Sequence, residues 1–191
     1  MTRRQKRLFS LILAILALGL SLTGQRLGWF EEPAGEIEQQ NPGLYSVTRF
    51  SDGDTITVDM NGQKETIRMI GVDTPETHDP DVPVQCYGPA ASAYTKNLIG
   101  QNKVRLEADP TNQNRDRYNR LLRYVYLPDG RLVQAELIKN GYGFAYTLFP
   151  FTKKDEFVRL QSQAETASKG LWGNCSPFQE ESGRWQTNPA G

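Results

Sequence analysis

Apolar and polar side chains alternate in two neighbouring runs of the chain, residues 55–59 and 64–70, and this period of two is typical of β-strands. The dipeptide Asn61-Gly62 separates the runs and is typical of tight hairpin turns, so the two strands should pair with each other. The outer ends of paired hairpin strands meet. The residues that precede the first strand should therefore lie beside those that follow the second.

The same reading predicts three more strands and three helices. Strands are expected at residues 44–50, 103–108 and 121–127, and an extended segment at residues 142–148. Helices are expected from Gly88-Pro89 to residue 100, over residues 132–140, and over residues 153–169, where apolar side chains recur every three or four positions. Five strands, with one helix after the third and further helices after the fifth, are the order of an oligonucleotide-binding (OB) barrel. The predicted fold class is therefore α+β.

The first thirty residues carry a targeting pattern. Residues 1–7 are rich in Arg and Lys, and residues 8–22 are apolar apart from Ser10 and Ser21. A run of this length suits a secretory signal peptide, whereas its extension to Trp29-Phe30 gives an uncleaved membrane anchor. Both alternatives stay open for residues 1–30. In either case the body should lie outside the cytoplasm, secreted or anchored to the outer face of the cytoplasmic membrane.

Composition divides the rest of the chain into three parts. Residues 31–43 are polar and acidic and should form a linker, residues 44–175 the folded domain, and residues 176–191 a polar tail that is disordered beyond Cys175. The two cysteines, Cys86 and Cys175, predict one disulfide bond in an exported protein, with two buried free thiols as the alternative. Two cysteines and one histidine lack the spacing of a zinc site.

The charge balance excludes nucleic-acid binding through a broadly basic surface. Lys+Arg and Asp+Glu both number 22, and without the four basic side chains among residues 3–7 the balance is 18 against 22. Domains that coat nucleic acids are usually basic. Any phosphate chemistry should therefore rest on a local cluster of charged residues.

Several motifs, taken together, resemble those of the staphylococcal nuclease (thermonuclease) family. They are D-G-D-T at 52–55, R-M-I-G-V-D-T-P-E at 68–76, Y-G-P-A-A-S-A-Y-T-K at 87–96, D-R-Y-N-R-L-L at 116–122 and G-L-W at 170–172. Each motif alone is weak, but their order and intervals are specific. The resemblance implies a five-stranded OB barrel with three helices and calcium-dependent endonuclease cleavage of DNA and RNA that leaves 3′-phosphate ends.

The resemblance implies a calcium site at one end of the hairpin. Asp54 and Asp73 correspond to calcium-binding carboxylates of the family, and the backbone carbonyl of Thr74 corresponds to a further ligand. Calcium prefers carboxylate and carbonyl oxygens and completes its coordination with water. These residue types therefore suit the cation.

Three further residues correspond to the family's catalytic groups. Arg68 and Arg120 match the two arginines that hold the scissile phosphate, and the arginine fork binds phosphate through two parallel hydrogen bonds. Glu76 matches the catalytic glutamate. It lies three residues beyond Asp73, near the metal site, where it can act as a general base on water or orient the water.

Tyr118 and Tyr146 correspond to tyrosines near the nucleotide pocket of the family, and Arg117 corresponds to a basic residue that contacts phosphate. Single strands should be the favoured substrate. Two positions depart from the family pattern. Asn119 stands where the family often has Gly, although Asn tolerates the left-handed backbone conformation. Leu148 occupies a position that can hold a base-contacting Tyr, so base stacking should be weaker.

Two other functions are less compatible with these residues. A non-catalytic OB module that binds single strands or a protein would be expected to lose acids or arginines of the site, yet Asp54, Arg68, Asp73, Glu76 and Arg120 are all present. A membrane-tethered calcium-binding adhesion domain leaves both arginines unexplained. The sequence therefore favours a monomeric phosphodiester hydrolase.

Overall fold

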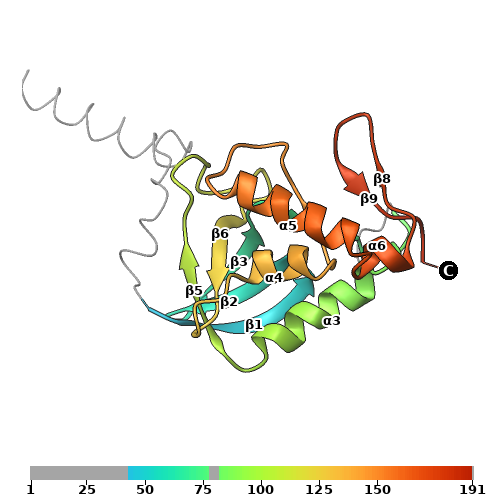
Figure 1. Cartoon of the computed structure of the whole chain (residues 1–191). Coiled ribbons are helices and arrows are strands. Elements are labelled where there is room, and N and C mark those ends of the chain that lie inside the picture. Colours follow the sequence, from blue (N-terminus) through green and yellow to red (C-terminus); the bar gives the residue numbers. More distant parts are fainter. Residues whose placement is uncertain (1–42, 78–81, 191) are drawn as a thin grey trace, which may run out of the picture. The chain divides into compact units, whose positions relative to one another are not determined.

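The computed structural model describes residues 43–77 and 82–190, and these are built around a closed five-stranded barrel (Figure 1). The strands are β1 (Tyr45–Asp52), β2 (Thr55–Met60), β3 (Gln63–Met69), β5 (Lys103–Glu107) and β6 (Leu121–Tyr126). Their order is β1-β2-β3-β6-β5, and β5 returns to β1, with Tyr45 opposite Val104. The predicted OB barrel is confirmed.

The β2–β3 hairpin has the turn that the sequence predicts. Asn61 and Gly62 both have positive φ, 57° and 93°, which is the backbone of a two-residue hairpin turn. Met60 faces Gln63 at the turn, and Thr55 faces Arg68 at the open end. The register therefore carries Arg68 to the end of the barrel where β2 begins.

Strand β6 lies parallel to β3, with Ile67 opposite Leu121 and Arg68 opposite Leu122. A parallel pair starts at the same end of the sheet. The segment that leads into β6 consequently approaches the barrel beside the second half of β3. This pairing brings two stretches of sequence about fifty residues apart to one place.

Three helices pack against the barrel. They are α3 (Gly88–Ile99), α4 (Val133–Lys139) and α5 (Lys154–Thr166), and Figure 1 shows α4 between the other two. The apolar faces of these helices contribute buried side chains to the core, among them Ile99, Leu137 and Phe157. Strands β4 (Val72–Asp73) and β7 (Phe144–Ala145) form a separate two-stranded sheet. Within the extended segment expected at residues 142–148, β7 is the part that forms a strand.

The predicted disulfide is present between Cys86 and Cys175, with 5.9 Å between the Cα atoms. It joins the segment before α3 to the end of the short helix α6 (Leu171–Asn174). The alternative of two free thiols is therefore wrong.

The expectation of a disordered tail at residues 176–191 is wrong for residues 176–190. They form a hairpin of β8 (Phe178–Gln179) and β9 (Trp185–Gln186), which Figure 1 shows beside α6. The Trp185 ring stacks on Phe144, with 5.8 Å between the centroids, and Thr187 is only 2% exposed. Packing of these two side chains against the body orders a segment whose composition is polar.

The predicted signal peptide or anchor at residues 1–30, and the predicted linker up to residue 42, lie outside the described residues. Among residues 43–77 and 82–190, none of the helices has the length and apolar character needed to cross a membrane.

Candidate active site

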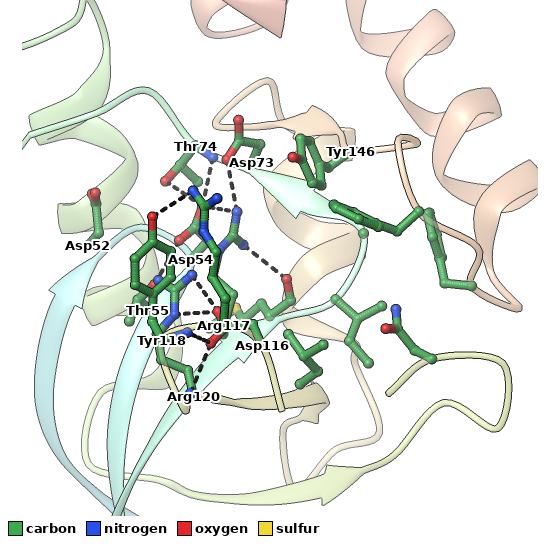
Figure 2. A pocket seen from close by; sticks show the side chains of 18 of the residues that line it. Asp52, Asp54, Thr55, Asp73, Thr74, Asp116, Arg117, Tyr118, Arg120 and Tyr146 are labelled. Carbon is green, nitrogen blue, oxygen red and sulfur yellow. Dashed lines mark hydrogen bonds and ion pairs between the residues drawn. The ribbon is translucent and has the colours of Figure 1, made fainter. Parts of the chain in front are cut away.

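A cavity of about 910 Å³ opens where the β1–β2 turn, the end of β3 and the segment before β6 meet. Figure 2 shows this pocket with acids and arginines gathered around it. All the residues that the sequence assigned to metal, catalysis or substrate line it: Asp54, Arg68, Asp73, Thr74, Glu76, Arg117, Tyr118, Arg120 and Tyr146. The structure therefore brings the whole predicted set together.

The two predicted metal-binding carboxylates lie side by side and are nearly buried, each 6% exposed. Asp54 lies in the turn before β2, and its Oδ2 accepts the backbone N–H of Thr74 at 2.9 Å. Its Oδ1 accepts the hydroxyl of Thr55 at 2.9 Å. Asp73 ends β4, and pairing with Phe144 of β7 fixes its backbone. Hydrogen bonds and strand pairing thus hold both acids in place.

Arg68 lies between these two acids. Its Nη2 is 2.8 Å from Asp73 Oδ1 and 3.2 Å from Asp54 Oδ2, while Nη1 donates to the carbonyl of Val72 at 2.7 Å. Burial alone would lower the pKa of Arg68, but the charges of Asp54 and Asp73 outweigh it and raise the pKa above its usual value. The guanidinium stays charged and has little freedom to move.

The turn after β3 depends on Gly71. Gly71 has φ 74°, a conformation that suits glycine, and a Cβ at this position would collide with the Phe151 ring. Its carbonyl accepts the backbone N–H of Tyr146 at 2.9 Å. This hydrogen bond fixes the position of Tyr146, whose side chain lines the cavity (Figure 2).

Glu76 follows the acid pair and is held by its backbone. Its N–H donates to Gln85 Oε1 at 2.9 Å, and its carbonyl accepts the N–H of Gln85 at 2.9 Å. Its Oε1 accepts the N–H of Thr77 at 2.9 Å. These hydrogen bonds fix the backbone of Glu76 beside Gln85, and with it the position of the carboxylate on the cavity wall.

Asp52 is an acid of the site for which the sequence analysis gave no role, although it opens the D-G-D-T motif. Burial, and then the negative charge of Asp54, raise the pKa of Asp52 to about 7. The charge of Glu76 and its hydrogen bond with Asp52 add to this rise. Three acids, Asp52, Asp54 and Glu76, thus crowd one side of the cavity, and a cation would relieve their repulsion.

Arg120 reaches the cavity from the segment before β6. Its Nε and Nη2 both lie 2.7 Å from Asp116 Oδ2, and its backbone N–H donates to Asp116 Oδ1 at 3.0 Å. Asn119, directly before it, has φ 62°, so the asparagine adopts the left-handed conformation that the sequence analysis allowed for it. Asp116 thus fixes the direction of Arg120, a role that sequence reasoning did not assign.

The predicted nucleotide-contacting residues form the outer rim. Tyr118 is 63% exposed, and the Arg117 guanidinium lies 4.8 Å from the centre of its ring and donates to its hydroxyl at 2.7 Å. Leu148 is also exposed, near the rim residues Tyr146 and Phe149 in sequence. An exposed aromatic ring backed by arginines can stack with an unpaired base.

The donor set suits calcium better than a transition metal. Among the described residues, no three His, Cys, Asp or Glu side chains are arranged to hold a metal ion. Two carboxylates and the Thr74 carbonyl leave most coordination positions to water and substrate, which calcium accepts and zinc does not. The residues present therefore fit the cation that the sequence predicts.

One further residue of the cavity comes from the C-terminal hairpin. Arg184 lines the cavity and donates from Nε to Asp73 Oδ2 at 2.8 Å. Residues 184 and 73 are far apart in the sequence, and no motif marks Arg184. Sequence reasoning assigned it to the disordered tail and so missed it.

Comparisons with known proteins find related nucleases. The family model described as staphylococcal nuclease homologue matches residues 66–174. A thermonuclease of Staphylococcus hyicus is 43% identical over 139 residues, 72% of this chain and 80% of that protein. A thermonuclease of Staphylococcus intermedius is 44% identical over 144 residues, 75% of this chain and 82% of that protein. Endonuclease YncB of Bacillus subtilis (strain 168) is 44% identical over 147 residues, 74% of this chain and 69% of that protein.

Proposed function

The chain belongs to the staphylococcal nuclease family, and on that premise we propose that it is a calcium-dependent endonuclease that cleaves DNA and RNA and leaves 3′-phosphate ends. That it is a nuclease, a hydrolase of phosphodiester bonds, follows from the family and from its identity with thermonucleases and an endonuclease. One observation carries the residue assignments: two arginines, an acid pair and a glutamate from distant segments line a single cavity.

Asp54, Asp73 and the carbonyl of Thr74 would hold the calcium ion. When bound, calcium neutralises charge on the phosphoryl group and places the substrate. The hydrogen bonds to Asp54 and the ion pair of Asp73 with Arg68 hold the two carboxylates in position before the ion arrives. A preorganised site of this kind loses little free energy in rearrangement during the reaction.

Arg68 and Arg120 bind the scissile phosphate from two sides. Arg68 is fixed by Asp73 and the Val72 carbonyl, and Arg120 is fixed by Asp116. Because negative charge is spread over the phosphoryl oxygens in the transition state, fixed guanidinium groups lower the barrier more than mobile ones. The parallel pairing of β3 with β6 sets the separation of the two arginines.

Glu76 acts on the water that attacks phosphorus. Its carboxylate lines the same cavity as both arginines, and its backbone is tied to Gln85. A carboxylate at this place accepts a hydrogen bond from water, orients it in line with the leaving oxygen and can take its proton.

We also propose that the protein acts outside the cytoplasm. The basic and apolar pattern of residues 1–30 supports export, as a secreted or membrane-anchored monomer. The disulfide between Cys86 and Cys175 is consistent with an oxidising compartment. The exposed Tyr118 ring on the rim supports a preference for single strands, whose bases are free to stack.

A nuclease assay on the full-length chain tests the proposal. Denatured DNA and RNA should be cleaved in calcium, the products should carry 3′-phosphates, and a chelator should abolish cleavage. Glu76→Gln should lower kcat by about 10²-fold or more, whereas Glu165→Gln, at an exposed position of α5, should leave it unchanged. Cleavage that persists fully in chelator would refute calcium dependence.

A further inference from the structure

The C-terminal hairpin of β8 and β9 delivers an additional arginine to the cavity. Arg184 directly precedes β9 and lines the same cavity as Arg68, Arg117 and Arg120. The family model matches residues 66–174 and so does not include Arg184. The contacts of Arg184 itself indicate its role.

The guanidinium of Arg184 is only partly used by the protein. Its Nε donates to Asp73 Oδ2 at 2.8 Å, while the side chain remains 41% exposed. Within the described part of the chain, its Nη1 and Nη2 make no hydrogen bond or ion pair. The fork of two terminal nitrogens, the part of arginine that fits phosphate oxygens, is therefore available.

The hairpin that carries Arg184 is firmly attached to the body. Trp185 packs against both Phe144 and Trp172, with ring centroids 5.8 Å and 5.3 Å away. The hydroxyl of Thr187 donates to the carbonyl of Cys86 at 2.8 Å, next to the disulfide. An arginine on such a support keeps its direction, which a side chain on a fraying tail would not do.

The hairpin also contacts the loop that carries the catalytic glutamate. Gln85 donates from Nε2 to Gln186 Oε1 at 3.2 Å, and the same Gln85 side chain accepts the N–H of Glu76. Cys86 donates its backbone N–H to the carbonyl of Asn188 at 2.7 Å. The hairpin is therefore part of the wall of the active site.

The charge of the cavity gives the reason for an extra arginine. Five acids line it, Asp52, Asp54, Asp73, Glu76 and Asp116, and four arginines do, counting Arg184. Asp54 and Asp73 share Arg68, at 3.2 Å and 2.8 Å, and Arg184 brings a second guanidinium to Asp73 through Nε. Because the acids of the cavity still outnumber the arginines, the positive charge of Arg184 offsets part of the repulsion that an anionic ligand would meet there.

We propose that Arg184 is a further phosphate-binding arginine, which holds a phosphodiester group of the nucleic-acid strand on the Asp73 side of the cavity. The proposal rests on the nuclease function and adds a subsite to it. Asp73 positions the guanidinium through Nε, and Nη1 and Nη2 bind the phosphate oxygens. The substrate strand thus spans from Arg117 and Tyr118 on one rim to the C-terminal hairpin on the other.

Binding of a fluorescent single-stranded DNA oligonucleotide, measured by anisotropy in calcium at several salt concentrations, tests the proposal. Full-length chain carrying Glu76→Gln serves as the parent, since it should bind without cutting. Adding Arg184→Gln should raise Kd about ten-fold. The slope of log affinity against log salt should become shallower by about 0.7, the loss of one phosphate contact on a single strand.

Arg131→Gln is the matched control. Arg131 also pairs through Nε with an aspartate, Asp129, and its side chain is 50% exposed, but it does not line the cavity. This variant should bind as the parent does. Arg184→Lys keeps the charge but lacks the fork, and should raise Kd about three-fold with the salt slope unchanged. The Arg184→Lys variant therefore tests the role of Arg184 independently if Arg184→Gln proves to have a lowered Tm.

Two failures can be told apart. If Arg184→Gln and Arg184→Lys both bind the oligonucleotide as tightly as the parent or more tightly, Arg184 is only an internal counterion of Asp73 and the inference is wrong. Calorimetric titration with calcium alone would then show higher calcium affinity in Arg184→Gln. If the parent binds no oligonucleotide and the wild-type chain cleaves none, the proposed function itself fails, and the subsite with it.

Discussion

Asp54 accepts the backbone N–H of Thr74 across twenty residues of sequence, at 2.9 Å between Oδ2 and the nitrogen. This bond joins the turn before β2 to the turn after β4. The same Asp54 oxygen also lies 3.2 Å from Arg68. One carboxylate therefore organises both the backbone of the proposed calcium site and the position of Arg68, an arginine that is proposed to bind phosphate.

Replacing Asp54 should separate these structural and metal-binding roles. Asp54→Asn keeps an oxygen acceptor for Thr74, so the free energy of unfolding should fall little, while calcium affinity drops at least ten-fold because a charged ligand is lost. Asp54→Ala leaves the N–H of Thr74 unpaired and should cost about 1–3 kcal/mol of stability in addition. Calcium calorimetry and urea denaturation measure the two effects. Equal stability of the two variants would contradict the capping role.

Asp116 should act through Arg120. Asp116→Asn removes the charged partner that Nε and Nη2 of Arg120 share, so the guanidinium should lose its fixed direction. We expect kcat to fall about ten-fold. In an Arg120→Lys background, the same change should have much less effect, because the group that Asp116 positions is already gone. If Asp116→Asn lowers kcat by the same factor in wild type and in the Arg120→Lys variant, Asp116 has another role.

The disulfide should stabilise the domain and keep the hairpin in the active-site wall. It links residues 89 positions apart, so its loss frees a long loop in the unfolded chain. Cys86→Ser together with Cys175→Ser should lower the free energy of unfolding by about 2–5 kcal/mol. The double variant should also bind the oligonucleotide more weakly than its parent, as Arg184→Gln does. Reduced wild-type protein should match the double variant in both measurements.

Asp109 should make the fold sensitive to acid. Burial would raise the pKa of Asp109, but hydrogen bonds from Thr111, Tyr124 and Thr152 outweigh it and hold the pKa well below its usual value. A carboxyl group with a lowered folded pKa stabilises the protein above its unfolded pKa of about 3.9. That stability is lost as the pH falls through the folded pKa.

Asp109→Asn should therefore reduce the free energy of unfolding near pH 7 by about 2 kcal/mol. This difference in stability between wild type and variant should become smaller below about pH 4. Urea denaturation between pH 7 and pH 3 measures it. Asp129→Asn is the control, because its pair with Arg131 is exposed and should contribute little at any pH. A stability difference between wild type and Asp109→Asn that does not change with pH would contradict the assignment of Asp109 as a charged carboxylate in the folded protein.

Local pattern was enough to predict the barrel. The alternation of Ile56 and Val58, and the Asn61-Gly62 turn, fix the β2–β3 hairpin because both depend on neighbours in sequence. The motif residues could be assigned because their intervals match a family. Their gathering in one cavity follows from the barrel topology, in which the open end of the hairpin meets the start of β6.

The C-terminal hairpin could not be predicted in this way. Residues 176–191 show neither a helical nor a sustained strand period, and their polar composition is typical of a tail. What orders them is contact with the body: Trp185 on Phe144, Thr187 on Cys86, and Arg184 on Asp73. None of these partners is a neighbour in sequence.

The sequence by itself determined the β2–β3 hairpin, the strand order of the OB barrel and the residues of the family motifs, because periodicity, turn chemistry and motif spacing are local properties. Tertiary structure alone decided that Asp116 directs Arg120 and that Arg184 reaches Asp73. Asp116 reads as one charge among several in a loop, and Arg184 as one in a tail. Their partners are chosen by where the folded backbone places the two carboxylates, which only long-range packing sets.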